Sequence, residues 1–168
     1  IILYITESIK NAHLPLPKLR ELAQIVCDRF GREKTPEMSY EISIVVVDDN
    51  QIRQLSGRFL NRDETTDCLS FDLSDDDEEQ THAGKRTSRI FELIVNGEMA
   101  ARQALLRGHS SEAELTLYIT HGLLHNFGFD DATPSQARTM HDAEDEILQQ
   151  LGYGYVYNRD IRAQEQQT

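Results

Sequence analysis

The sequence predicts an α+β fold in which one mixed sheet of about four strands is covered by helices. The first observation is size, because 168 residues, 39% of them hydrophobic, suit one domain with a sizeable core. The second is that segments with strand and helix periodicity are mixed without the strict alternation that builds a wholly parallel sheet. The third is that no repeat and no interdomain linker divides the chain. We therefore expect a single domain over residues 1–168, with a polar tail over about 158–168.

Four apolar or β-branched segments are the expected strands. They cover residues 2–6, 42–47, 68–73 and 90–95. The segment 42–47 is β-branched except for Ser43, which is typical of a largely buried strand.

Apolar residues at helical spacing predict five helices. They are one that ends at Gly31, one that begins after Asp48 or Asp49, one over about 97–106, a long one that ends near Gly128, and one from Pro134 to about Gln150. At the start of the long helix, Ser111 and Glu114 are three residues apart and resemble a capping box.

The charge of the chain bears on its possible ligands. A net charge of −12 argues against broad electrostatic binding of nucleic acid, because phosphate contacts normally come from a Lys/Arg patch. Much of this charge is local, however. An acidic run over 72–79 is followed by Lys85, Arg86 and Arg89, which is typical of a solvated loop. Such a loop leaves the active cleft free to carry a different local charge.

The sequence also bears on the compartment. Cys27 and Cys68 have neither CxxC spacing nor the density of a secreted disulfide scaffold, so we expect both to be reduced core residues. The apolar stretch 1–5 is too short for a signal-peptide core, and no membrane span is present in the sequence. We therefore expect a cytoplasmic protein with no membrane partner.

The spacing HxxxHxxGxxD, formed by His121, His125, Gly128 and Asp131, carries the chemistry. Histidines four residues apart project from one face of a helix, within reach of a single ion. A glycine in the left-handed conformation can end that helix and let the chain turn back, so that Asp131 or its neighbour Asp130 faces the imidazoles. Three protein ligands leave the fourth position of zinc open to water, as in catalytic sites.

A lone HxxxH pair is more often a surface or packed pair than a metal site. The glycine and the acid at the right offsets favour the metal. Zinc proteases of the HExxH type carry their general-base glutamate directly after the first histidine, where this chain has Gly122. Peptide hydrolysis by that mechanism therefore lacks its base.

The segment 121–131, HGLLHNFGFDD, resembles the metal-binding motif of the YbeY family, bacterial endoribonucleases that mature ribosomal RNA. A second stretch, FLNRD at 59–63 leading to TDCLSF at 66–71, resembles the family's other motif, in which a strand follows a short helix. The resemblance extends over roughly residues 35–155. Two separate motifs in the right order make it specific.

Two positions depart from the family pattern. Asp131 stands where the family usually has a third histidine, and because two histidines with one carboxylate can also hold iron(II), the metal could be iron or another divalent ion as well as zinc. Leu60 stands where many members have an arginine that helps to hold RNA phosphate. Arg58 and Arg62 lie on either side of it and could supply the guanidinium group.

The resemblance implies a metal-dependent endoribonuclease specific for single strands, acting in rRNA maturation and ribosome quality control. It implies one zinc ion per chain on His121, His125 and Asp131, single-stranded RNA as substrate, and the small ribosomal subunit or assembly proteins as partners. We expect Arg58 or Arg62 to contact phosphate. Asp130 is a candidate proton carrier, or an acceptor that orients an imidazole, and a purely turn-forming role fits it equally well. The rival functions are a metalloprotease and a non-catalytic ribosome assembly factor with a structural metal.

Other polar residues stay closer to ordinary structural roles. His141 and Glu144, three residues apart on the last helix, could approach the site, but ordinary helix amphipathicity favours an exposed polar face for them. Thr66, Asp67 and Ser70 could line the cleft at the end of a strand. His13, His82 and His109 lie in expected loops and receive no role.

Overall fold

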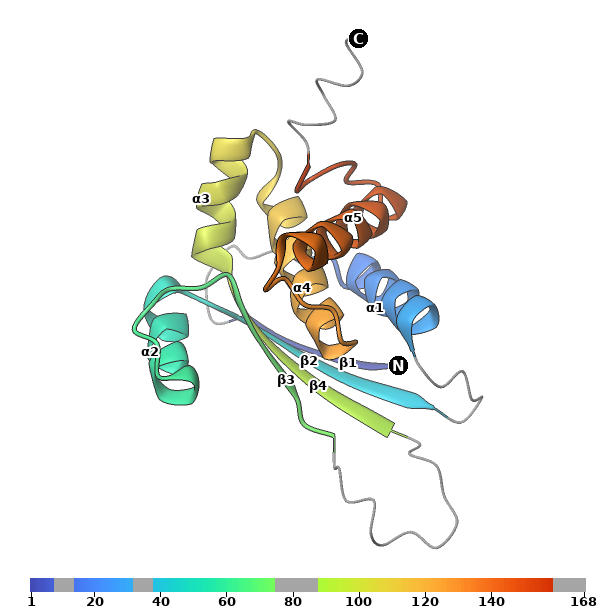
Figure 1. Cartoon of the computed structure of the whole chain (residues 1–168), viewed down its shortest axis with the longest axis horizontal. Coiled ribbons are helices and arrows are strands. Elements are labelled where there is room, and N and C mark those ends of the chain that lie inside the picture. Colours follow the sequence, from blue (N-terminus) through green and yellow to red (C-terminus); the bar gives the residue numbers. More distant parts are fainter. Residues whose placement is uncertain (8–13, 32–37, 75–87, 159–168) are drawn as a thin grey trace, which may run out of the picture.

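A computed structural model describes residues 1–7, 14–31, 38–74 and 88–158 of the chain (Figure 1). The elements in order are β1 (Ile2–Glu7), α1 (Leu16–Phe30), β2 (Ser39–Val47), α2 (Asp49–Leu60), β3 (Cys68–Asp72), β4 (Ser88–Asn96), α3 (Gly97–Arg107), α4 (Ser111–Asn126) and α5 (Pro134–Gln150). The predicted α+β class with a mixed four-stranded sheet is confirmed. His13, His82, Lys85, Arg86, most of the acidic run and nearly all of the predicted tail lie outside the described residues.

The sheet has the strand order β1-β2-β4-β3. β1 pairs with β2 and β2 with β4 in parallel, whereas β3 runs antiparallel to β4 at the edge. Along β4, Leu93 and Val95 belong to the main core and Ile94 to a second cluster with Ile52 of α2. Because neighbouring residues of a strand point to opposite faces, α2 covers the face opposite the main core. Figure 1 shows α1, α4 and α5 grouped together, with α2 apart from them.

Helix α4 is the central helix of the main core. Residues 113–120 and 122–124 of it are all buried, as expected for a helix enclosed on every side. Its N-cap is Ser110, whose hydroxyl accepts from the Ala113 backbone N–H at 3.1 Å. The predicted capping box of Ser111 and Glu114 is wrong, because the Glu114 carboxylate is buried and pairs with Arg107 at 3.1 Å instead.

Gly122 lies where α4 closely approaches the sheet. A Cβ atom built at this position would lie 2.6 Å from Sγ of Cys68 on β3 and 3.0 Å from Cδ2 of Leu93 on β4. Both distances are shorter than normal van der Waals contact. The missing side chain therefore lets the helix lie against the strands, with His121 and His125 beside the edge of the sheet. Both cysteines are free, as predicted.

Candidate metal centre

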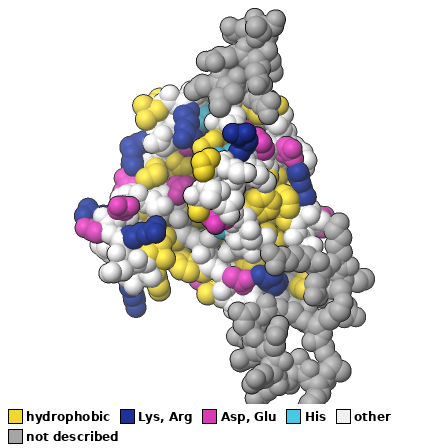
Figure 2. All heavy atoms as spheres, in the orientation of Figure 1, with side chains coloured by type: hydrophobic (Ala, Val, Ile, Leu, Met, Phe, Trp, Pro, Cys, Tyr) yellow, Lys and Arg dark blue, Asp and Glu magenta, His cyan; other side chains and the backbone are white. Residues whose placement is uncertain are grey.

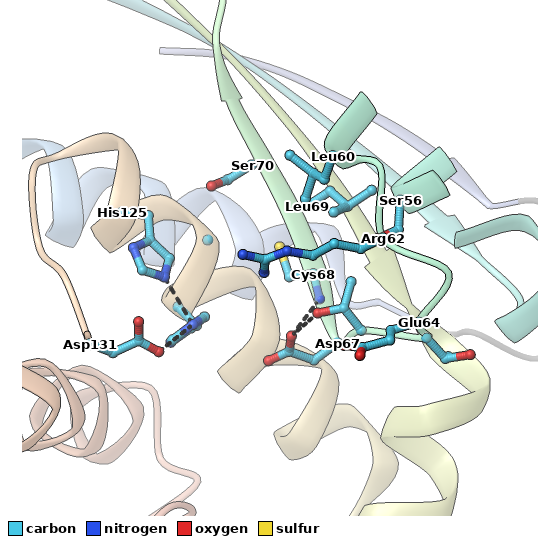
Figure 3. Close-up of a pocket in the computed structure, with 14 residues that line it drawn as sticks. Ser56, Leu60, Arg62, Glu64, Asp67, Cys68, Leu69, Ser70, His125 and Asp131 are labelled. Carbon is cyan, nitrogen blue, oxygen red and sulfur yellow. Dashed lines mark hydrogen bonds and ion pairs between the residues drawn. The ribbon is translucent and has the colours of Figure 1, made fainter. Parts of the chain in front are cut away.

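The two histidines of the motif face one another from successive turns of α4. The Nε2 atoms of His121 and His125 are 3.1 Å apart, and Oδ2 of Asp131 lies 3.8 Å from Nε2 of His121. Ligating atoms of all three residues lie within 4.8 Å of one another. Figure 3 shows Asp131 turned toward the imidazole pair. The three ligands predicted from the sequence are thus brought together.

The turn after α4 places the aspartate. The helix ends at Asn126, and Gly128 has a φ of 90°, which favours glycine. The backbone N–H of Phe129 donates to the carbonyl oxygen of Leu124 at 3.0 Å. This hydrogen bond folds the chain back over the last turn of the helix and returns Asp131 to the histidines.

Each imidazole is held through its other nitrogen. Nδ1–H of His121 donates to Oε1 of Glu144 at 2.7 Å, and Nδ1–H of His125 donates to the carbonyl oxygen of Phe129 at 3.1 Å. A carbonyl and a carboxylate only accept, so both Nδ1 atoms carry a proton, and in the neutral rings both Nε2 atoms present lone pairs. Two lone pairs 3.1 Å apart repel each other unless a cation lies between them.

The separation of the two nitrogens suits a metal ion. Tetrahedral zinc with Zn–N bonds of about 2.0–2.1 Å places two nitrogen ligands about 3.3 Å apart. The observed Nε2 separation of 3.1 Å is close to this value. Acceptors on the second ring nitrogen are also the usual arrangement of metal-binding histidines, since they fix the tautomer and raise ligand basicity. His121, His125 and Asp131 therefore fit a divalent cation.

The predicted exposed face for His141 and Glu144 is wrong. Glu144 is 1% exposed, and its second oxygen accepts from Nδ1 of His141 at 2.8 Å. Burial raises the pKa of Glu144, but hydrogen bonds from two imidazoles outweigh it and bring the pKa below its usual value. Burial likewise lowers the pKa of His121, and the hydrogen bond to Glu144 more than restores it. Because the pKa of His121 is raised, metal binding at this ring competes with a proton and weakens in acid.

Two pockets meet at the candidate metal centre. The smaller, of about 310 Å³, is here called the Arg62 pocket and is also lined by Cys68 and Ser70 of β3. The larger, of about 500 Å³, is called the Tyr157 pocket and is also lined by residues of α3 and α5. Both are lined by Thr65, Thr66, Asp67, His121 and Asp131. The pockets thus form two halves of one groove, and the predicted cleft positions of Thr66, Asp67 and Ser70 are confirmed.

The structure separates the two candidate arginines. Figure 3 shows the Arg62 side chain extending into its pocket toward the histidines. Arg58 does not line that pocket, and its guanidinium carbon lies 5.6 Å from the centre of the Phe59 ring. The difference arises at the end of α2, where Asn61 takes a left-handed conformation with φ of 54° and redirects the chain.

Of the roles considered for Asp130, the contacts of its side chain favour the turn-forming one. Its Oδ1 accepts from the backbone N–H groups of Asp131 at 2.8 Å and Ala132 at 3.3 Å. It lines neither pocket of the groove. The imidazole acceptors are Glu144 and the Phe129 carbonyl instead. Asp130 therefore stabilises the turn that carries Asp131.

Apart from histidine, the basic residues that line the two pockets are Arg62 in one and Arg107 in the other. On the face drawn in Figure 2, basic and acidic side chains of the described residues are interspersed. Phosphate binding would therefore depend on single guanidinium groups such as that of Arg62 rather than on a broad basic face.

No helix among the described residues has both the length and the apolar character needed to span a membrane.

Comparisons with known proteins agree with this site. The family model described as Endoribonuclease YbeY matches residues 4–152. A protein of that name from Heliobacterium modesticaldum is 33% identical over 145 residues, covering 81% of this chain and 87% of its own length. Its namesake from Bacillus cereus is 31% identical over 151 residues, covering 89% of this chain and 93% of its own length.

The fold also matches a solved structure. The solution structure of a protein from Thermotoga maritima superposes with a TM-score of 0.54, at 18% identity, over 99% of this chain and 96% of that protein. At this identity the likeness concerns the fold alone. The family model and the two sequence relatives go further, and from them it follows that this chain belongs to the YbeY family.

Proposed function

We propose that this protein is an endoribonuclease of rRNA maturation that cleaves single-stranded RNA at a divalent cation held by His121, His125 and Asp131. The observation that carries the proposal is the convergence of the His121 and His125 Nε2 atoms, 3.1 Å apart, at the meeting point of two pockets. The family match supports RNA as the substrate class. Zinc is the ion to test first, and iron(II) second. Small-subunit rRNA and its assembly proteins are the proposed partners, and the cytoplasm is the corresponding compartment.

The chain's own groups prepare the site. Glu144 and the Phe129 carbonyl hold the two imidazoles in the ligating tautomer, so no tautomer change is needed on binding. The ion, when bound, supplies activation of a water molecule near neutral pH and neutralisation of charge on the phosphoryl oxygens. Arg62 extends into the groove, where its guanidinium group can donate two hydrogen bonds to a phosphate.

Asp67 is the proposed proton acceptor. Its Oδ1 accepts from the Thr66 hydroxyl at 2.9 Å and from the Cys68 backbone N–H at 2.8 Å, which fixes the plane of the carboxylate. Because Asp67 lines both pockets, its other oxygen can face a water molecule beside the scissile phosphate.

The two rival functions fit less well. A zinc protease needs a carboxylate directly after His121, but any side chain at position 122 would collide with Cys68 of β3. A purely structural zinc usually has four protein ligands. Within the described residues, the cluster around the two Nε2 atoms has three.

The proposed function is tested by RNA cleavage with and without metal. The zinc-loaded protein is expected to cut a single-stranded RNA internally and to leave casein intact, because position 122 lacks the carboxylate that an HExxH protease uses as its general base. A chelator should abolish cleavage, and added zinc should restore it. Proteolysis by the unmodified protein, or RNA cleavage that survives complete metal removal, contradicts the proposal.

The Asp67→Asn protein is the matched control for this assay. It keeps all three ligands and the size of the side chain, so it should bind metal normally while losing most of its cleavage. General-base removal typically costs about 10²–10⁴-fold in rate. Cleavage at the rate of the unmodified protein would remove Asp67 from the mechanism without touching the metal site.

Arg62 and Arg58 make a second, paired test. Arg62→Ala is expected to weaken RNA binding and to flatten its dependence on salt, because one phosphate contact is lost. Arg58→Ala removes the same charge from a nearby position outside the pocket and should leave both quantities unchanged. Binding is measured by fluorescence anisotropy at several salt concentrations. Equal losses in the two variants would mean that the arginines act only through overall charge.

A further inference from the structure

We propose that the Tyr157 pocket is a nucleobase subsite, in which the base next to the cleaved phosphodiester stacks on the Tyr157 ring. The inference rests on the proposed function, because it takes single-stranded RNA as the ligand. His121 and Asp131 line both this pocket and the Arg62 pocket, so the two pockets adjoin at these residues. A strand whose phosphate contacts Arg62 would therefore carry its next nucleotide past the metal centre into the Tyr157 pocket.

Tyr157 is an exposed ring on a rigid support. One face stacks on the His141 imidazole, with ring centres 3.5 Å apart and planes 13° from parallel. His141 in turn is hydrogen-bonded to buried Glu144. The Tyr157 residue nevertheless remains 43% exposed, and it lines the pocket. Successive bases of single-stranded nucleic acid bind by stacking on aromatic rings of this kind.

A buried carboxylate fixes the segment that carries this ring. Asp145 is 3% exposed, and it accepts backbone hydrogen bonds from Val156, Tyr157 and Asn158, each 3.0 Å long. Burying a carboxylate is costly unless it is fully hydrogen-bonded, and here three N–H groups of one short segment fulfil that need. These hydrogen bonds hold the segment 156–158 in place, with Tyr157 as its middle residue. The family match ends at residue 152, so Asp145 lies within the region that it covers and the segment 156–158 lies outside it.

The rest of the pocket suits a nucleoside. Met99 and Leu117 supply apolar contact, and the Gln103 amide can donate to and accept from the edge of a base. Arg107 also lines the pocket. One nitrogen of its guanidinium group pairs with Glu114 at 3.1 Å, and the others can reach a sugar or phosphate. The volume of about 500 Å³ falls in the range of about 300–1,000 Å³ that small ligands occupy.

The test uses short single-stranded RNAs that carry one fluorescent adenine analogue at successive positions. Stacking quenches this fluorophore, so mixing with the metal-loaded protein in a stopped-flow instrument reports the subsite before cleavage proceeds. The same mixture is later analysed for cleavage products. The unmodified protein should quench the analogue at one position beside the cut. Tyr157→Leu should abolish this quenching and weaken binding about tenfold, the scale of one base–aromatic stack. Tyr157→Phe keeps the ring and should preserve both.

Tyr4→Leu is the matched control, because Tyr4 is 53% exposed on β1 and lines neither pocket. It should quench and bind as the unmodified protein does. If the unmodified protein cleaves RNA but quenches the analogue at no position, or if Tyr157→Leu quenches and binds normally, the subsite is wrong and the proposed function stands. If the unmodified protein neither binds nor cleaves RNA, both proposals fall.

Discussion

The His125→Ala protein is expected to lose its bound zinc and its RNA cleavage together. The candidate site on the two Nε2 atoms has three side-chain ligands among the described residues, so removing one leaves two, too few to hold the ion against a chelator. Glu144→Gln should act more weakly, because it disturbs only the orientation of His121 and His141. Loss of such an orienting partner typically weakens metal affinity by about 10–100-fold. Elemental analysis and chelator competition measure both effects.

The two aspartates provide the control for this series. Asp131→Ala should lower zinc content, whereas Asp130→Ala removes only a carboxylate that caps the turn, and so it should retain the metal. Near-stoichiometric zinc in Asp131→Ala would show that the third ligand has been misidentified. Loss of zinc from Asp130→Ala in its place would make that residue the ligand.

Gly122→Ala is expected to lower the free energy of unfolding by about 1–3 kcal/mol, because an added methyl group overpacks a close contact. The new Cβ would lie 2.6 Å from Sγ of Cys68, so α4 or β3 has to shift. Alanine is the better helix former by about 0.8–1.0 kcal/mol, which offsets part of the cost. Urea denaturation of the two proteins measures the difference. A stability equal to or above that of the unmodified protein would contradict the close approach.

Cys68→Ala tests the cause of that loss. It removes the sulfur atom that the new Cβ would contact. Adding Gly122→Ala to the Cys68→Ala protein should therefore cost less stability than adding Gly122→Ala to the unmodified protein. Leu93 remains 3.0 Å from the same point, and recovery should therefore be incomplete. Strictly additive effects would place the strain elsewhere.

The parts of the site that were predictable from the sequence are local in the chain. His121, His125, Gly128 and Asp131 belong to one helix end and its turn, and the geometry of an α-helix fixes their relative positions. The strands and helices were predictable for a similar reason, since each depends on the periodicity of its own residues.

Glu144 could not be assigned to the site from local pattern, because its contact with His121 joins two helices across 23 positions of sequence. The sequence did carry a signal for its burial. Met140, Glu144, Ile147 and Leu148 follow helical spacing, and three of these four are apolar. A carboxylate within such an apolar stripe has to find a partner in the interior.

The choice between Arg58 and Arg62 was likewise beyond the sequence. It depends on the left-handed conformation of Asn61, a residue type that enters this region more readily than most but is not bound to it. The cap of α4 shows the same limit on a smaller scale. Ser110 and Ser111 are chemically equal candidates, and the packing of Glu114 decides between them.

The two imidazoles differ in how well their orientation withstands mutation. His121 is oriented by a side chain, Glu144, so a single substitution in the coding sequence can remove its acceptor. His125 is oriented by the main-chain oxygen of Phe129, which every amino acid possesses. Exchange of the Phe129 side chain keeps that oxygen in place as long as the turn holds. Among variants of this protein, a substitution that removes the hydrogen-bond acceptor of an imidazole should therefore affect His121 and not His125.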